Sequence, residues 1–177
     1  MKKIFHRRHR RSIRLPEYDY SQSGCYYITI CTNHRELVFG NIKNAEMELS
    51  ELGEIVKKYL LEIPQHFENV FLDEYIIMPN HIHFNINIVG VQNFEPLRNE
   101  YQKIIPKSIG SIIRAYKASV THWCRKNGYP NFKWQRNYFE HIIRNEEDHF
   151  RITEYIKNNP LQWELDEENP YHAKKIK

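Results

Sequence analysis

The chain has 177 residues, of which 41% are hydrophobic and 14% are aromatic, and it carries a formal net charge of +4. This length suits one domain with a real core, and without about eighteen consecutive apolar residues we expect no membrane-spanning segment. Three cysteines without a C-x-x-C pair are typical of reduced thiols rather than of a zinc site, and they predict a cytoplasmic protein.

The basic residues are concentrated in two segments. Residues 1–14 contain seven Lys or Arg and no acid, and residues 101–144 contain nine against the single acid Glu140. A charge run is most simply a solvated face, but this segregation indicates a surface for a polyanion, with nucleic acid as the first candidate. The candidate phosphate contacts are Arg7, Arg8, Arg10, Arg11, Arg14, Lys103, Lys107, Arg114, Lys117, Lys133, Arg136 and Arg144.

The first predicted element is a strand over 26–32, because YYITICT is rich in β-branched and aromatic residues. Short strands are predicted at 37–39 and 47–49. Ser50 is a typical helix N-cap, and the apolar residues after it recur at helical spacing. We expect a helix there that ends or kinks at Pro64.

Two long strands are predicted next, over 70–78 and 81–89. The dipeptide Pro79-Asn80 between them is a turn signal, so the two strands are expected to form a hairpin. Residues 90–107 lack periodicity and predict a loop.

The C-terminal half predicts two helices with one strand between them. Ser108 is a candidate N-cap for a helix over 109–126, and a strand is expected at 138–143. A helix over 146–158 has acids in its first turn. The interleaved elements predict an α+β sandwich, an antiparallel sheet with helices packed on it.

A pair of histidines stands out in MPNHIHFNINIV, residues 78–89. Side chains alternate between the faces of a strand, so His81 and His83 share one face with Asn85 and Asn87. One such histidine is more often structural than a ligand, but two co-facial imidazoles can bind the same metal ion. Two ligands do not complete a site, so a third must come from elsewhere.

The last predicted helix offers that third ligand. Tyr155 and Asn159 are four residues apart and share a helical face. An amide oxygen suits Mg²⁺ or Mn²⁺, and a tyrosine hydroxyl beside such a cation can attack phosphorus. The alternative is that Tyr155 simply belongs to the apolar stripe with Ile152 and Ile156.

Four segments resemble the REP-associated tyrosine transposases, a subgroup of the single-tyrosine HUH transposases. They are RRSIRLPEYDYSQSGCYYITICT (10–32), MPNHIHF (78–84), WQRNYFEHIIRN (134–145) and EYIKNNP (154–160), in the family's order. The resemblance implies a ferredoxin-like fold, with an antiparallel sheet and helices on one face, and usually a dimer. The composition of the chain indicates a basic N-terminal arm over 1–24 and a polar C-terminal tail over 164–177, which places the expected catalytic domain over 25–163.

The resemblance also implies the chemistry. His81, His83 and Asn159 would hold a divalent metal, Mg²⁺ or Mn²⁺, and Tyr155 would cleave and rejoin single-stranded or hairpin DNA through a 5′-phosphotyrosine. Trp134, Tyr138 and Phe139 are candidates for stacking on unpaired bases, and burial of Trp134 and Phe139 in the core is the open alternative. Gln135 is a candidate for positioning the substrate.

Two other functions are alternatives to this one. H-x-H also opens the sites of amidohydrolases and metallo-β-lactamases, but the motif is not followed by the x-D-H of the second, and the first requires a barrel of about 250 residues. A non-catalytic, DNA-binding regulator of the same fold is the second alternative. The presence of all four site residues argues against lost chemistry.

The metal assignment makes a prediction about pH. The imidazoles must be neutral to bind a metal, so activity should fall below about pH 6. Rates of DNA cleavage measured from about pH 5 to about pH 8 test this, and a flat profile would count against the ligands.

Overall fold

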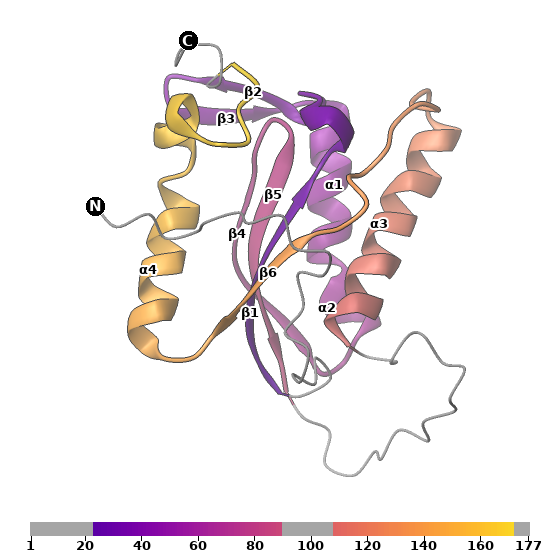
Figure 1. Ribbon diagram of the computed structural model, residues 1–177. Coiled ribbons are helices and arrows are strands. Elements are labelled where there is room, and N and C mark those ends of the chain that lie inside the picture. The colour runs from indigo at the N-terminus through magenta and orange to yellow at the C-terminus, as the bar shows by residue number, and fades with distance from the viewer. Residues whose placement is uncertain (1–22, 90–107, 172–177) are drawn as a thin grey trace.

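The structure is a computed structural model that describes residues 23–89 and 108–171 (Figure 1). The predicted loop over 90–107 lies outside the described residues, as does nearly all of the arm over 1–24. The candidate DNA contacts among them are Arg7, Arg8, Arg10, Arg11, Arg14, Lys103 and Lys107.

Four strands form the central sheet. β1 (Gly24–Cys31), β4 (Val70–Ile77), β5 (His81–Ile88) and β6 (Phe139–Ile143) lie in the order β4-β5-β1-β6, and every neighbouring pair is antiparallel. With α-helical segments between β1 and β4 and between β5 and β6, the central sheet has the β-α-β-β-α-β order of ferredoxin-like folds. The predicted α+β class, antiparallel sheet and β4–β5 hairpin are confirmed.

Helices cover both faces of this sheet. α1 (Glu51–Leu61), the short α2 (Ile63–His66) and α3 (Ile109–Lys126) lie on one side, and α4 (Glu146–Lys157) lies on the other (Figure 1). The expectation that all helices pack on one face is therefore corrected. The physical reason is that β5 is buried along nearly its whole length on both faces, so each face needs a covering layer.

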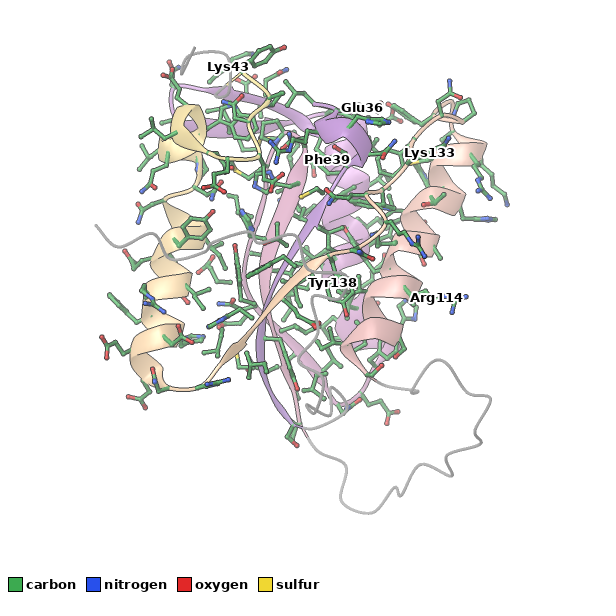
Figure 2. The ribbon with its side chains drawn as sticks, in the orientation of Figure 1. Glu36, Phe39, Lys43, Arg114, Lys133 and Tyr138 are labelled. Atoms are coloured by element: carbon green, nitrogen blue, oxygen red, sulfur yellow. The ribbon has the colours of Figure 1, made fainter. Side chains whose placement is uncertain are left out.

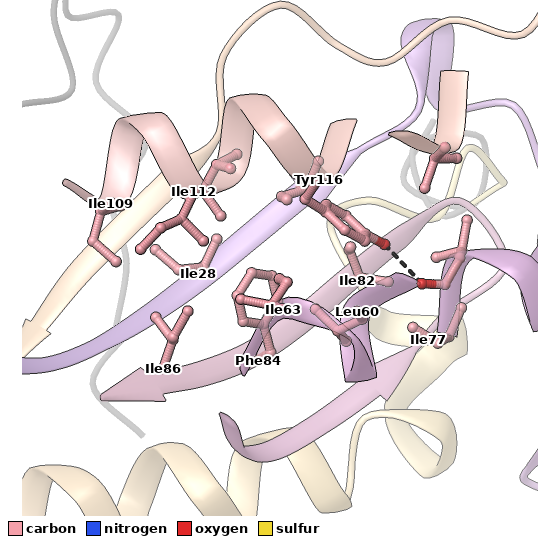
Figure 3. Close-up of a cluster of buried hydrophobic side chains, with 14 of the residues drawn as sticks. Ile28, Leu60, Ile63, Ile77, Ile82, Phe84, Ile86, Ile109, Ile112 and Tyr116 are labelled. Carbon is pink, nitrogen blue, oxygen red and sulfur yellow. Dashed lines mark hydrogen bonds between the residues drawn. The ribbon is translucent and has the colours of Figure 1, made fainter. Parts of the chain in front are cut away.

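The main core lies between the sheet and the pair α1 and α3. Ile28 of β1 and Phe84 of β5 are fully buried there against Ile112 of α3 (Figure 3). The Tyr116 hydroxyl of α3 donates a 3.0 Å hydrogen bond to the carbonyl oxygen of Val56 in α1. This bond satisfies a buried polar group and ties the two helices together.

Polar side chains at the expected positions start the helices. Ser50 accepts a hydrogen bond from the amide of Gly53, and Ser108 accepts one from the amide of Ser111. The helix predicted over 109–126 has these bounds in the structure. Asn145 caps α4 in the same way.

A small hairpin separates β1 from α1. β2 (Gly40–Lys43) pairs with β3 (Glu46–Leu49) through Asn44 and Ala45, whose φ angles of 50° and 63° are left-handed. Such a pair forms the tight turn that matches strand twist. The strand predicted over 37–39 is wrong, because the hairpin begins at Gly40.

The described segment after α4 packs onto the domain. The 3-10 helix η2 (Pro160–Leu165) follows α4, and Glu168 and Asn169 beyond it are buried. Part of the segment predicted as a polar tail over 164–177 is thus ordered against the sheet. Among the described residues, no helix is long and apolar enough to cross a membrane.

Gly53 makes a testable prediction about this fold. Gly→Ala inside a helix normally stabilises it by about 1 kcal/mol. A Cβ on Gly53 would lie 2.1 Å from the carbonyl oxygen of Phe39, where backbone must shift. Overpacking of this kind costs about 1–3 kcal/mol, so Gly53→Ala should lower the free energy of unfolding in urea. Glu54→Ala, at an exposed position of the same helix, is the control, and an unchanged or raised stability in Gly53→Ala would contradict the close contact.

Candidate metal centre and nucleophile

His81 and His83 lie side by side on the face of the sheet that α4 covers. Their ring centroids are 4.4 Å apart, and both side chains are buried. Ile82, between them, belongs to the core on the opposite face. The strand period of two therefore brings the predicted histidine pair together.

The orientation of His81 is set by Asn80. Asn80 Nδ2 donates to the carbonyl oxygens of Arg35 and Glu168, at 3.2 and 2.8 Å. Its Oδ1 is 2.8 Å from His81 Nδ1 and can only accept, so the proton of the neutral imidazole is on Nδ1. His81 Nε2 then carries the lone pair that a metal would use.

His83 is oriented by two hydroxyl groups of β1. Its Nδ1 is 2.7 Å from the Tyr27 hydroxyl and 2.9 Å from the Thr29 hydroxyl. Its Nε2 is buried and has no hydrogen-bond partner among the described residues. Burial lowers the pKa of His83 to about 3, so the ring is neutral across the physiological range.

A carboxylate lies against the two imidazoles. Asp166 Oδ2 is 3.7 Å from His81 Nε2, and ligand atoms of His81, His83 and Asp166 all lie within 4.8 Å of one another. Two nitrogens and one oxygen at this spacing fit a divalent cation such as Mn²⁺ or Zn²⁺. Sequence reasoning missed Asp166: the acidic run at 166–168 was visible, but no spacing connects it to the histidines.

The segment that carries Asp166 is anchored beside the β4–β5 turn. The Nε of Arg35 is 3.1 Å from a carboxylate oxygen of Glu168, and its Nη1 donates to the carbonyl oxygen of Glu167 at 2.6 Å. Asn80 bonds the same segment through Glu168 O. Asn80 therefore orients His81 and holds the Asp166 segment at the same time.

Tyr155 and Asn159 stand one turn apart at the end of α4. The Tyr155 ring centroid is 5.4 Å from that of His83. The Asn159 side chain lies close enough to the Tyr155 hydroxyl to lower the pKa of that hydroxyl, and Asn159 Oδ1 is buried without a hydrogen-bond partner among the described residues. All four residues predicted for the site thus lie together, and the unpaired Oδ1 and His83 Nε2 are atoms that a cation would satisfy.

Burial also raises the pKa values of Tyr155 and Asp166 in the site. It is the largest cause that raises the pKa of Tyr155 to about 12, and the nearby charge of Asp166 adds to it. Burial likewise raises the pKa of Asp166 to about 6. As pH falls through about 6 the Asp166 carboxyl takes up a proton, whereas His83 stays neutral down to about pH 3. We therefore expect protonation of Asp166, rather than of His83, to cause the predicted fall in activity below about pH 6.

α4 is held on the sheet by a small apolar cluster and by polar contacts at its edges. Ile152 and Ile156 of α4 pack on Tyr27 of β1 and Ile143 of β6. Three contacts flank this cluster. They are His149 Nε2 to Asp73 Oδ2 at 2.6 Å, Lys157 Nζ to Glu74 Oε2 at 3.3 Å, and His141 Nε2 to Asp148 Oδ2 at 2.7 Å. These contacts fix the position of α4 on the sheet, and they therefore fix the position of Tyr155 relative to the histidines.

The described candidates for DNA contact are spread over two sides of the molecule. Arg114, on α3, and Lys133 lie across the sheet from α4 (Figure 2). Arg136 and Arg144 are exposed at either end of the β6 edge. Tyr138 is half-buried against the main core. The basic candidates among the described residues therefore do not converge on the histidines as one patch.

Lys117 and Trp134 brace the segment before β6. Lys117 Nζ donates to the carbonyl oxygens of Gln135 and Asn137, at 2.6 and 3.4 Å, and Trp134 Nε1 donates to Lys117 O at 3.2 Å. Trp134 also packs on Phe39. Both side chains, which the sequence made candidates for DNA contact, thus also have a structural role.

Comparison with known proteins identifies the family. No protein-family model matches the chain. Over 167 residues it is 48% identical to an uncharacterized protein of Haemophilus influenzae, a match that covers 90% of this chain and 92% of that protein. The chain belongs to that protein's family.

One solved structure has a fold similar to that of this chain. It is a REP-associated tyrosine transposase bound to a REP hairpin, with a TM-score of 0.57 and 21% identity, covering 84% of this chain and 74% of that chain. The resemblance to these transposases is thereby confirmed at the level of the fold. A second structure, named as a transposase of Deinococcus radiodurans R1, has a TM-score of 0.48 and 16% identity over 82% of this chain and 95% of that one, and carries no argument.

Replacement of Asp166 tests the ligand set of this family member. Asp166→Asn removes a carboxylate charge from the group within 4.8 Å, so Mn²⁺ affinity measured by calorimetry should fall roughly tenfold or more. Glu167→Gln is the matched control, because Glu167 is exposed and uses its backbone oxygen to bind Arg35. Equal affinity in Asp166→Asn and wild type would remove Asp166 from the site.

Proposed function

We propose that the protein is a metal-dependent endonuclease and transposase acting on single-stranded or hairpin DNA, with Tyr155 as the nucleophile. The observation that carries this proposal is a tyrosine hydroxyl beside a buried group of two imidazoles and a carboxylate. The fold shared with a transposase bound to a REP hairpin and the four motifs support the same function. A regulator without catalysis would not need the buried Nε2 of His83 and Oδ1 of Asn159, which have no hydrogen-bond partner among the described residues.

His81, His83 and Asp166 would hold a divalent cation, and Asn159 Oδ1 is the fourth candidate ligand. Mn²⁺ accepts this mixture of nitrogen and oxygen ligands well, and Mg²⁺ is the alternative. When bound, the cation supplies Lewis-acid stabilisation of charge on a phosphate oxygen.

Tyr155 carries out the exchange of bonds. Its hydroxyl oxygen forms a bond to phosphorus while the bond from phosphorus to the 3′ oxygen breaks. Tyr155 loses its phenolic proton, and the leaving 3′ oxygen gains one. The 5′-phosphotyrosine keeps the energy of the phosphodiester, so a later 3′-OH can reverse the step without ATP.

The edge of the sheet beside the site offers a path for the strand. Cys31 pairs with His81 on one side, and its carbonyl accepts a 2.9 Å hydrogen bond from the amide of Gln135 on the other. Gln135 and the exposed Arg136 are therefore at the level of the histidines, and we assign them to the DNA backbone. Lys117 would contribute through the segment that it braces.

The decisive experiment looks for a covalent adduct. Wild-type protein is incubated with a labelled DNA hairpin that has single-stranded flanks, with Mn²⁺, and the products are separated under denaturing conditions. We expect a labelled protein band with wild type and none with Tyr155→Phe, which lacks the attacking oxygen. Tyr59→Phe, on α1 across the sheet, should behave as wild type.

Two results would contradict the proposal. An adduct of equal yield in Tyr155→Phe would move the nucleophile elsewhere, and mass spectrometry of the labelled peptide would locate it. Hairpin binding by wild-type protein without any adduct would favour the regulatory alternative.

A further inference from the structure

Trp163 is an aromatic side chain beside the metal ligands to which the proposed function gives no role. It lies in η2, and its ring centroid is 6.1 Å from that of His81, with the two ring planes inclined at 37°. Trp163 is partly exposed, whereas His81 is fully buried. Trp163 therefore lies at the boundary between the buried histidines and the solvent.

The backbone of Trp163 is fixed by the segment that carries Asp166. Its carbonyl oxygen accepts a hydrogen bond from Asn169 Nδ2 at 2.9 Å and one from the amide of Asp166 at 3.2 Å. Pro160, whose ring restricts the backbone, begins the same 3-10 helix. An aromatic ring on a fixed backbone is preorganised, so little conformational freedom is lost when a flat ligand packs on it.

The aromatic residues that the sequence made candidates for stacking on bases are engaged in packing. Trp134 packs against Phe39 in the main core, with ring centroids 5.6 Å apart. Tyr138 packs on the same core, and Phe139 packs on the small apolar cluster under α4. Trp163, by contrast, is partly exposed next to a candidate metal ligand.

The surface around the indole of Trp163 suits a nucleobase better than a phosphate. Leu161 and Leu165, on the same 3-10 helix, are 67% and 73% exposed. Glu164 and Glu167 are exposed acids, and their charge repels phosphate. This surface therefore favours the uncharged face of a base and keeps the phosphates of a strand away from η2.

We propose that Trp163 is a binding site for an unpaired nucleobase, which stacks on the indole while the neighbouring phosphate lies at the histidines. This inference rests on the proposed function, which brings single-stranded DNA to the site. Aromatic side chains bind single strands in this way because every base has a π face. A base held on Trp163 also orients the adjoining phosphate relative to the Tyr155 hydroxyl.

A structural role competes with this one, in which Trp163 only shields His81 from water. The two roles differ when no divalent cation is present. A shield acts on the metal centre, so Trp163→Ala would lower Mn²⁺ affinity and leave the binding of DNA in EDTA unchanged. A stacking site acts on the DNA, so its loss weakens binding in EDTA as well.

The first test measures, by fluorescence anisotropy in EDTA, the affinity for a labelled DNA hairpin with single-stranded flanks and for the same hairpin without flanks. Trp163→Ala should bind the flanked hairpin about tenfold more weakly than wild type, because one stacked base is lost. Trp163→Phe should retain most of the affinity, because a smaller aromatic ring remains. Wild type and Trp163→Ala should bind the hairpin without flanks equally, which also shows that the variant is folded.

Phe150→Ala is the matched control for this test. Phe150 is also an exposed aromatic residue, 68% exposed, but it lies on α4 more than one turn before Tyr155. Its replacement should leave the affinity for both hairpins unchanged. An unchanged affinity of Trp163→Ala for the flanked hairpin, or an equal loss for both hairpins, would overturn the stacking site.

The second test locates the base. Single abasic sites are placed in turn along the flanks, so that one base is removed while the phosphates stay, and each DNA is bound to wild type and to Trp163→Ala. At one position the abasic site should weaken wild type about tenfold and Trp163→Ala hardly at all, because the same contact is already missing. Losses that add at every position would overturn the proposal.

The two tests separate this inference from the function on which it rests. Wild-type protein that binds neither hairpin would overturn the proposed function, and the stacking site with it. A covalent adduct with wild type, together with wild-type affinity of Trp163→Ala for the flanked hairpin, would overturn only the role of Trp163.

Discussion

The site depends on the register between β1 and β5, the two central strands of the sheet. In that register Thr29 lies opposite His83, Cys31 opposite His81, and Tyr27 opposite Asn85. Directly opposed side chains on one face of an antiparallel pair are about 4.5–5.5 Å apart at Cβ, close enough for hydrogen bonds between them. A slip of one residue would turn both histidines into the apolar core and the isoleucines towards α4. The main core therefore fixes the site indirectly, through the pairing that it enforces.

The second constraint is the cost of burying polar groups under α4. His81, His83 and Asn85 are 0%, 3% and 0% exposed, where an unmade hydrogen bond costs about 1–3 kcal/mol. Tyr27, Thr29 and Asn80 offset that cost at the Nδ1 atoms of the histidines. The Nε2 atom of His83 and the Oδ1 atom of Asn159 are left unpaired among the described residues. Two of the buried polar atoms without a hydrogen-bond partner are thus atoms that would bind a cation.

Sequence reasoning succeeded where the information is local. The period of a strand paired His81 with His83, the period of a helix paired Tyr155 with Asn159, and Ser108 marked the start of α3. It failed for Asp166, which reaches the histidines only because Arg35 and Asn80 hold the segment after η2. Sequence reasoning also did not predict that a helix covers the second face of the sheet. Alternating polar and apolar residues in β5 are typical of a half-exposed strand, and nothing local reveals that α4 buries the polar half.

The attachment of α4 explains why nucleophile and ligands can act as one unit although they come from separate layers. The helix carries Tyr155 and Asn159, while the histidines belong to the sheet. Its apolar contact is small, with Ile152 and Ile156 as its buried side chains, so the edge contacts to Asp73 and Glu74 of β4 carry weight in setting its position. β4 is in turn the hairpin partner of β5. An exposed contact such as that of Lys157 with Glu74 contributes little on its own, about 0–1 kcal/mol. Together the edge contacts tie the nucleophile to the hairpin that carries the ligands, so a shift of α4 would move the Tyr155 oxygen relative to His83 before it disturbed the main core.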